Sequence, residues 1–423
     1  MNKKWALFHN ETWRRLAGCL LYFLKWLVIA SVIGVISGLI GSVFHTCIEE
    51  VTLFREGHTY MLCLLPFAGL LIVFLYRRAG LADDRGTNLV LDSIHSNQQV
   101  PFRMTPLIVV GTILTHLCGG SAGREGAALQ VGGSIGSTCG RLLRLHEQDR
   151  RILVMCGMSA VFTAMFGTPI TATVFSMEVS NVGIVYYGAF VPCIISAAVA
   201  YGLTSYMGIS ATRYLVDGTY ELSLLLFLKV ILLAVLCGVV GILLCHTLHK
   251  VSHISKEKIS NDYIRIFVGG VIIILLTLLV GNSYYNGAGA NMIDSALHGQ
   301  LPRTAFLWKI VFTAVTMGMG YKGGEIVPTL FIGAAFGNLV GPLLGIDIPL
   351  AAAICMIALF CAVVNCPLAS LLLGLEIFER TDLLLLATAC AVSYFFSGYY
   401  GLYSSQTIIY DKTSMERIER PTH

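Results

Sequence analysis

Long apolar segments that recur from one end of the chain to the other limit most strongly what this sequence can fold into. The segment 16–44 holds a single charged residue, Lys25, and the segment 61–76 holds none. Further apolar segments lie near 105–119, 152–177, 182–211, 222–245, 264–281, 304–320, 327–346, 348–375 and 382–403. A helix needs about 20 apolar residues to cross the hydrocarbon core of a bilayer. Some segments reach that length and others fall short, which predicts an all-α polytopic membrane protein with some helices that enter the bilayer without crossing it.

Composition and charge agree with one membrane domain. The chain has 423 residues, of which 56% are hydrophobic and 12% are charged, about half the usual charged share. Basic residues form short clusters beside apolar segments, which is typical of cytoplasmic loops and a poor pattern for nucleic-acid binding. We expect a single domain over 1–423 with no cytoplasmic regulatory domain. The first apolar segment is too long for a cleaved signal peptide and lacks an evident cleavage site.

Cysteine spacing gives no sign of a metal site or of disulfides. The sequence contains thirteen cysteines and no CxxC pair. Most lie inside apolar segments, as Cys63, Cys193 and Cys390 do, so we expect them to be small buried hydrophobic residues.

Three landmarks recur in the same order in both halves of the chain. The first half has GREG at 123–126, GTP at 167–169 and Glu178, and the second has KGGE at 322–325, NCP at 365–367 and Glu376. The distance from the proline to the second glutamate is nine residues in each half, and the distances between the glutamates are 53 and 51 residues. We therefore predict a duplicated half, with a substrate site between the halves that is built from broken helices.

Glycines beside charged residues interrupt the apolar pattern at both first landmarks. Glycine lets the backbone approach an ion closely, and the helix that follows presents unsatisfied N–H groups and the positive end of its dipole. Two such helix ends can bind an anion without a fixed cation that would hold it too tightly for release. Glu125 lies at one of these ends, and an ionisable group within a membrane domain is a functional candidate. The alternative is a helix-capping glutamate paired with Arg124.

Four elements resemble the CLC family of anion channels and proton-coupled antiporters. GREGAALQ at 123–130 is similar to its GREGP element, whose glutamate is the external gate, and GGEIVP at 323–328 is similar to its GGIFAP element, whose amides bind the anion. FGTPITATVFSME and VNCPLASLLLGLE resemble its two Pro-to-Glu helices. The resemblance implies the CLC fold, with inverted-topology repeats over about 20–210 and 222–405 and re-entrant helices. It also implies a homodimer, and a role for Tyr403 on the inner side of the anion site.

The sequence departs from the chloride transporters at several positions. The best candidate for the GSGIP element is GTNLV at 86–90, so that Thr87, or Asn88 after a one-residue shift, replaces the serine. Glu325 follows GYKGG in place of an apolar residue, and Ala127 follows GREG in place of proline. The inner proton-relay glutamate is replaced by Val179. These departures resemble the bacterial fluoride/proton antiporter branch.

The resemblance therefore implies export of cytoplasmic fluoride in exchange for protons, in the plasma or inner membrane of a prokaryote. Glu125 is expected to gate the pathway and carry the proton, with no metal or cofactor. The expected anion-binding residues are Thr87, Asn88, Arg124, Gly126, Glu325, Ile326, Val327 and Tyr403. The alternatives are a chloride/proton antiporter or a chloride channel of the same fold. A membrane-embedded enzyme or a cation-translocating subunit is not expected, because no HExxH, paired aspartates or Ser/His pair occurs in a plausible membrane setting. The nearest match, His146-Glu147, lies in a basic loop.

Overall fold

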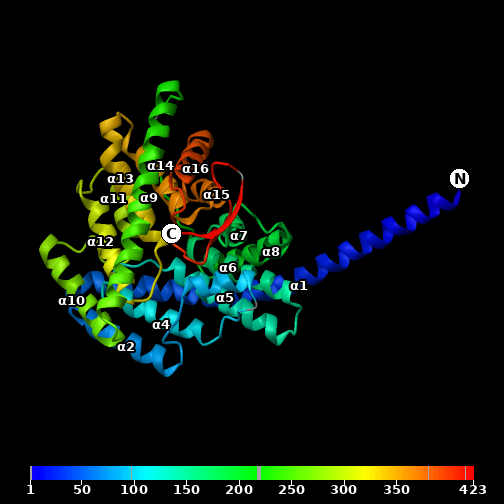
Figure 1. Ribbon diagram of the computed structural model, residues 1–423, viewed down its shortest axis with the longest axis horizontal. Coiled ribbons are helices and arrows are strands. Elements are labelled where there is room, and N and C mark those ends of the chain that lie inside the picture. Colours follow the sequence, from blue (N-terminus) through cyan, green and yellow to red (C-terminus); the bar gives the residue numbers. More distant parts are fainter. Residues whose placement is uncertain (1, 97, 217–220, 380, 415) are drawn as a thin grey trace.

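The computed structural model describes the backbone of residues 2–96, 98–216, 221–379, 381–414 and 416–423, and the side chains of these residues from Trp13 onward. Sixteen α-helices lie within these ranges (Figure 1). The first eight are α1 (Asn2–Gly57), α2 (Leu65–Arg78), α3 (Thr87–His95), α4 (Met104–Leu117), α5 (Glu125–Leu142), α6 (Glu147–Phe166), α7 (Pro169–Glu178) and α8 (Phe190–Tyr206). The others are α9 (Leu224–Lys258), α10 (Asp262–Val280), α11 (Ala290–Leu297), α12 (Ala305–Gly318), α13 (Ile326–Leu344), α14 (Ile348–Val364), α15 (Pro367–Ile377) and α16 (Leu383–Phe396). The 3-10 helices are η1 (Thr59–Leu64) and η2 (Tyr187–Ala189), and the strands are β1 (Asn181–Val182), β2 (Thr407–Tyr410) and β3 (Arg417–Pro421).

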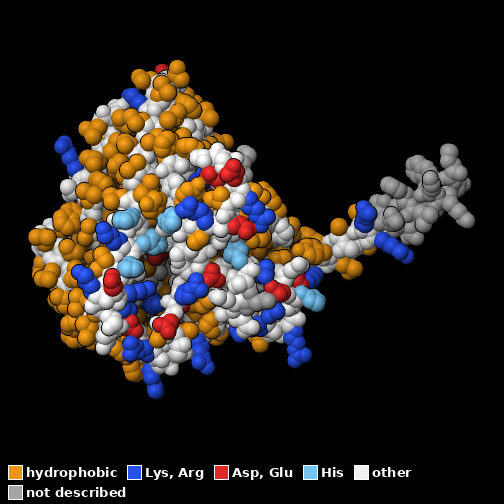
Figure 2. All heavy atoms as spheres, viewed as in Figure 1, with side chains coloured by type: hydrophobic (Ala, Val, Ile, Leu, Met, Phe, Trp, Pro, Cys, Tyr) orange, Lys and Arg blue, Asp and Glu red, His pale blue; other side chains and the backbone are white. Residues whose placement is uncertain are grey.

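Helix lengths confirm the prediction of a polytopic helical protein with short helices among the long ones. Within the described ranges six helices are long and apolar enough to cross a membrane. The helices α4, α12, α14, α15 and α16 are apolar but shorter. Apolar side chains cover much of the visible surface (Figure 2), as expected for a surface that lies in lipid.

Two apolar segments that look continuous in the sequence are broken in the structure. The segment 152–177 divides into α6 and α7 at Gly167, and the segment 348–375 divides into α14 and α15 at Asn365. Both break residues have a positive φ, of 73° and 56°, which only glycine and, less readily, asparagine adopt at low cost. The following helix then begins at Pro169 or Pro367, where the missing N–H costs nothing.

The second glutamate of each half caps a helix of the other half. The Glu178 carboxylate accepts hydrogen bonds from the amides of Leu368 (3.3 Å) and Ala369 (2.9 Å) in the first turn of α15. The Glu376 carboxylate accepts two from the first turn of α7, at 3.1 and 2.7 Å. A carboxylate satisfies amides that have no partner inside the helix and is stabilised by the positive end of its dipole. These two glutamates therefore hold the halves together.

The remaining features of the fold are a small sheet and the placement of the cysteines. The strands form one sheet in the order β1-β2-β3, so β2 pairs with β1, which follows α7, and with β3 on its other side. Most cysteines are buried, but the prediction for Cys63 is wrong because η1 leaves it exposed on the outer surface. An apolar residue on the surface of a membrane domain can face lipid, which a hydrophobicity pattern does not distinguish from burial in protein.

Candidate functional site

The two glycine-rich loops meet and bring the starts of α5 and α13 together. The Gly123 amide donates to the Gly324 carbonyl at 2.6 Å, and the Gly324 amide donates to the Gly123 carbonyl at 2.8 Å. A Cβ on Gly324 would lie 2.4 Å from the Gly126 amide nitrogen, so glycine is required for this close approach. Two helix N-termini thus point their free N–H groups at one region, as the sequence predicted.

Glu125 places its carboxylate among these backbone amides. It is the first residue of α5 and is fully buried. Its Oε2 accepts a hydrogen bond from the Arg124 amide at 3.0 Å, and the carboxyl also interacts with the Val327 amide at the start of α13. Its Oε1 has no hydrogen-bond partner among the described residues. The carboxylate therefore occupies the position in which amides of both halves could hold an anion.

Glu325 lies on the opposite helix end, at the start of α13. It precedes α13 as the N-cap residue and is partly exposed. A Cβ on Gly126 would lie 3.4 Å from its Oε2, so its side chain extends to the start of α5. Each glutamate thus reaches the helix that the other half supplies.

Arg124 contributes its backbone amide, and its guanidinium lies between Glu125, His45 and the Met165 carbonyl. Its Nη2 donates to His45 Nε2 (3.2 Å) and to the Met165 carbonyl (3.4 Å), and its Nε lies 3.6 Å from Glu125 Oε1. The sequence pattern could not find His45, because this residue of α1 lies 79 residues away from Arg124 in the chain and meets it only in the folded protein. Arg124 is therefore paired with Glu125, as in the alternative of a capping glutamate, and its amide also donates to this carboxylate.

Thr87 and Asn88 begin α3 and are tied to different neighbours. The Thr87 hydroxyl donates to the Gly126 carbonyl at 3.3 Å and accepts from Gln130 Nε2 at 3.2 Å. The Asn88 Oδ1 accepts from the Ser405 amide at 3.0 Å. Thr87 therefore joins α3 to α5, and Asn88 joins α3 to the loop that carries Tyr403.

Tyr403 is buried near the two glutamates. It is 2% exposed, and its hydroxyl has no hydrogen-bond partner among the described residues. The carboxyls of Glu325 and Glu125 lie within electrostatic range of this hydroxyl. Its loop is fixed by the Thr422 hydroxyl, which donates to the Tyr403 carbonyl at 2.7 Å. A buried hydroxyl without a partner is costly, so this group is available to a ligand.

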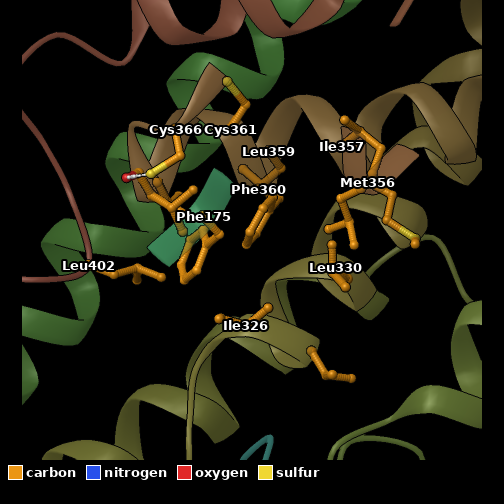
Figure 3. Close-up of a cluster of buried hydrophobic side chains, with 14 of the residues drawn as sticks. Phe175, Ile326, Leu330, Met356, Ile357, Leu359, Phe360, Cys361, Cys366 and Leu402 are labelled. Atoms are coloured by element: carbon orange, nitrogen blue, oxygen red, sulfur yellow. Dashed lines mark hydrogen bonds between the residues drawn. The ribbon is translucent and has the colours of Figure 1, made fainter. Parts of the chain in front are cut away.

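Ile326 and Val327 begin α13 beside Glu125, and the Val327 amide interacts with the Glu125 carboxyl. The Ile326 side chain points into an apolar cluster with Phe175 and Phe360 (Figure 3), and it is fully buried. This packing fixes the start of α13 against α7 and α14. Their predicted contribution through backbone amides agrees with this orientation.

A sequence model of the family described as voltage gated chloride channel matches residues 68–398. This chain belongs to that family, the CLC family. It is 34% identical over 400 residues to a chloride/fluoride channel protein of Pseudomonas syringae pv. tomato, covering 92% of this chain and 88% of that protein.

Two solved structures of the CLC fold and a further relative are also similar to this chain. A crystal structure of a CLC-type fluoride/proton antiporter is similar with a TM-score of 0.87 and 32% identity, over 90% of this chain and 98% of that one. A slow cyanobacterial chloride/proton antiporter is similar with a TM-score of 0.76 and 23% identity, over 88% and 94% of the chains. An H(+)/Cl(-) exchange transporter of Yersinia pestis is 26% identical over 85% of this chain and 81% of that protein.

Proposed function

We propose that this CLC protein is a fluoride/proton antiporter that exports cytoplasmic fluoride, and that it is not an enzyme. The observation that carries the proposal is the buried Glu125 carboxylate among the amides of Arg124 and Val327. An anion and this carboxylate compete for the same donors. Protonation makes the carboxyl neutral and weakens its attraction to the helix ends, so the side chain leaves with its proton and an anion enters. The relatives named for fluoride support the choice of anion.

The remaining residues fit this cycle. Val179 is fully buried and apolar where chloride exchangers are expected to have an inner glutamate. The proton must then reach both sides on Glu125 itself. The Tyr403 hydroxyl, and Glu325 when it is protonated, are the proposed donors that hold the anion or the displaced carboxylate. We further propose one domain of two repeats, a homodimer, and a place in the plasma or inner membrane of a prokaryote.

Flux from liposomes tests the choice of anion. Purified protein is expected to release fluoride faster than chloride by about tenfold or more, because fluoride is the stronger hydrogen-bond acceptor and an advantage equal to one or two hydrogen bonds has about that effect. Anion efflux is followed with ion-selective electrodes and proton uptake with a pH electrode. Equal efflux of the two ions would favour the alternative, a chloride/proton antiporter. The H(+)/Cl(-) exchange transporter of Yersinia pestis is a relative with that activity in its name.

Removing the Thr87 hydroxyl tests which residue contacts the anion. Thr87→Ala is expected to lower the fluoride-to-chloride flux ratio about fivefold, the effect of one hydrogen bond. Thr87→Ser keeps the hydroxyl and is the matched control. If Thr87→Ala leaves the ratio unchanged and Asn88→Ala lowers it, Asn88 is the contact.

A further inference from the structure

Lys322 lies beside the proposed anion site but has no part in the cycle described above. Its Nζ is 3.2 Å from Asp84 Oδ2 and 4.0 Å from the centre of the Tyr76 ring. Its stem packs against α4, where a Cβ on Gly111 would lie 3.0 Å from the Lys322 Cβ and Cγ. The ammonium is therefore held in one place by three elements.

Asp84 connects this lysine to the start of α3. Its side chain is 1% exposed. While Oδ2 pairs with Lys322, Oδ1 accepts a hydrogen bond from the Gly86 amide at 3.0 Å. Gly86 has a φ of 58° and immediately precedes Thr87. One carboxylate thus fixes both the backbone turn that begins α3 and the loop before α13.

These contacts close a ring around the site. The start of α3 is joined to α5 by the Thr87 hydroxyl and the Gly126 carbonyl. The loop before α5 is joined to the loop before α13 by the paired amides and carbonyls of Gly123 and Gly324. The Asp84–Lys322 pair joins the loop before α13 back to α3. These three elements carry all the expected anion contacts except Tyr403, and each is tied to the other two.

A gain in folding stability does not by itself explain the Asp84–Lys322 ion pair. Removing a charged pair from water is expensive, and an apolar pair of similar size is often equally stable or more so. A fixed ion pair does set the distance between the segments that carry it. Fluoride is smaller than chloride, so its donors must stand closer together.

We propose that Asp84 and Lys322 are positioning residues that set the separation between the starts of α3 and α13, and thereby the preference for fluoride over chloride. This inference rests on the proposed function. It concerns the geometry of the site and requires no contact between Lys322 and the anion.

A double-mutant cycle in liposomes tests the pair. Lys322→Met and Asp84→Asn are each expected to lower the fluoride-to-chloride flux ratio about fivefold, and the double variant is expected to lower it no further. Lys322→Arg keeps the charge and should keep most of the ratio. A ratio that is unchanged in the folded variants, or effects that multiply in the double variant, would overturn the inference.

Two controls separate this inference from other causes. Arg77 and Asp262 form another ion pair at 2.9 Å, one residue along α2 from Tyr76, and Arg77→Met with Asp262→Asn should leave the ratio unchanged. If Lys322→Met and Asp84→Asn do not fold singly, the variant that carries both changes leaves no unpaired charge and is compared with the native protein. An unchanged fluoride-to-chloride flux ratio in that variant again rejects the positioning role of Asp84 and Lys322. A native protein without fluoride preference would instead reject the proposed function.

Discussion

Replacing Glu125 by glutamine is expected to abolish proton transport. Glutamine has nearly the size of the protonated glutamate but cannot release a proton, so anion movement loses its coupling. Because Glu125 is the proposed carrier between the two sides, proton flux should fall by about a hundredfold or more, a typical effect of removing a positioned proton-transfer group. The measurement is simultaneous fluoride and proton flux in liposomes.

A surface glutamate provides the control for this experiment. Glu257 has a side chain that is 70% exposed and lies near His253, so Glu257→Gln should leave both fluxes unchanged. Proton movement that stays locked to anion flux in Glu125→Gln would reject the gate and carrier role of Glu125.

The largest expected loss of folded protein comes from Gly157→Val. A Cβ on Gly157 would lie 2.1 Å from the Gly132 carbonyl oxygen, and one on Gly132 would lie 2.2 Å from the Gly157 carbonyl oxygen. The helices α5 and α6 thus touch backbone to backbone, and neither atom can move aside as a flexible side chain could. We expect destabilisation of more than about 3 kcal/mol, beyond the usual range for overpacking. The yield of monodisperse protein after detergent extraction measures it.

Another helical glycine offers a matched comparison. A Cβ on Gly202 in α8 would meet no atom within 4 Å, so Gly202→Val should change stability by about 0.5 kcal/mol or less. Equal yields of folded protein from Gly157→Val and Gly202→Val would show that the α5–α6 contact is not as close as described.

The second half repeats this packing, and the sequence contained the signal. Glycines recur every fourth residue at 132, 136 and 140 in α5 and at 333, 337 and 341 in α13. Small residues at this spacing let membrane helices approach closely. In α13, a Cβ on Gly333 would lie 2.5 Å from the Cys355 carbonyl oxygen of α14. The pattern could have predicted which faces of α5 and α13 are in contact, though not the partner helices.

Local sequence determined the elements that the site uses. Apolar segments predicted the membrane helices. The places where helices begin were predicted from local glycines and prolines, at Gly123, Gly324, Pro169 and Pro367, because backbone conformation depends on neighbouring residues. The order of the motifs gave the family. The meeting of two helix N-termini with Glu125 between them was also predicted from the repeat.

Tertiary structure alone decided which side chains meet across long distances in the chain. It turned the Arg124 guanidinium to His45, paired Asp84 with Lys322, and made Glu178 a cap of α15. It also buried Tyr403, which the sequence could not distinguish from an interfacial tyrosine. The partners of these residues lie on helices far away in sequence, and their contacts depend on how whole helices pack. A local pattern specifies where a helix begins and which residues it carries, but not which other helix its side chains will reach.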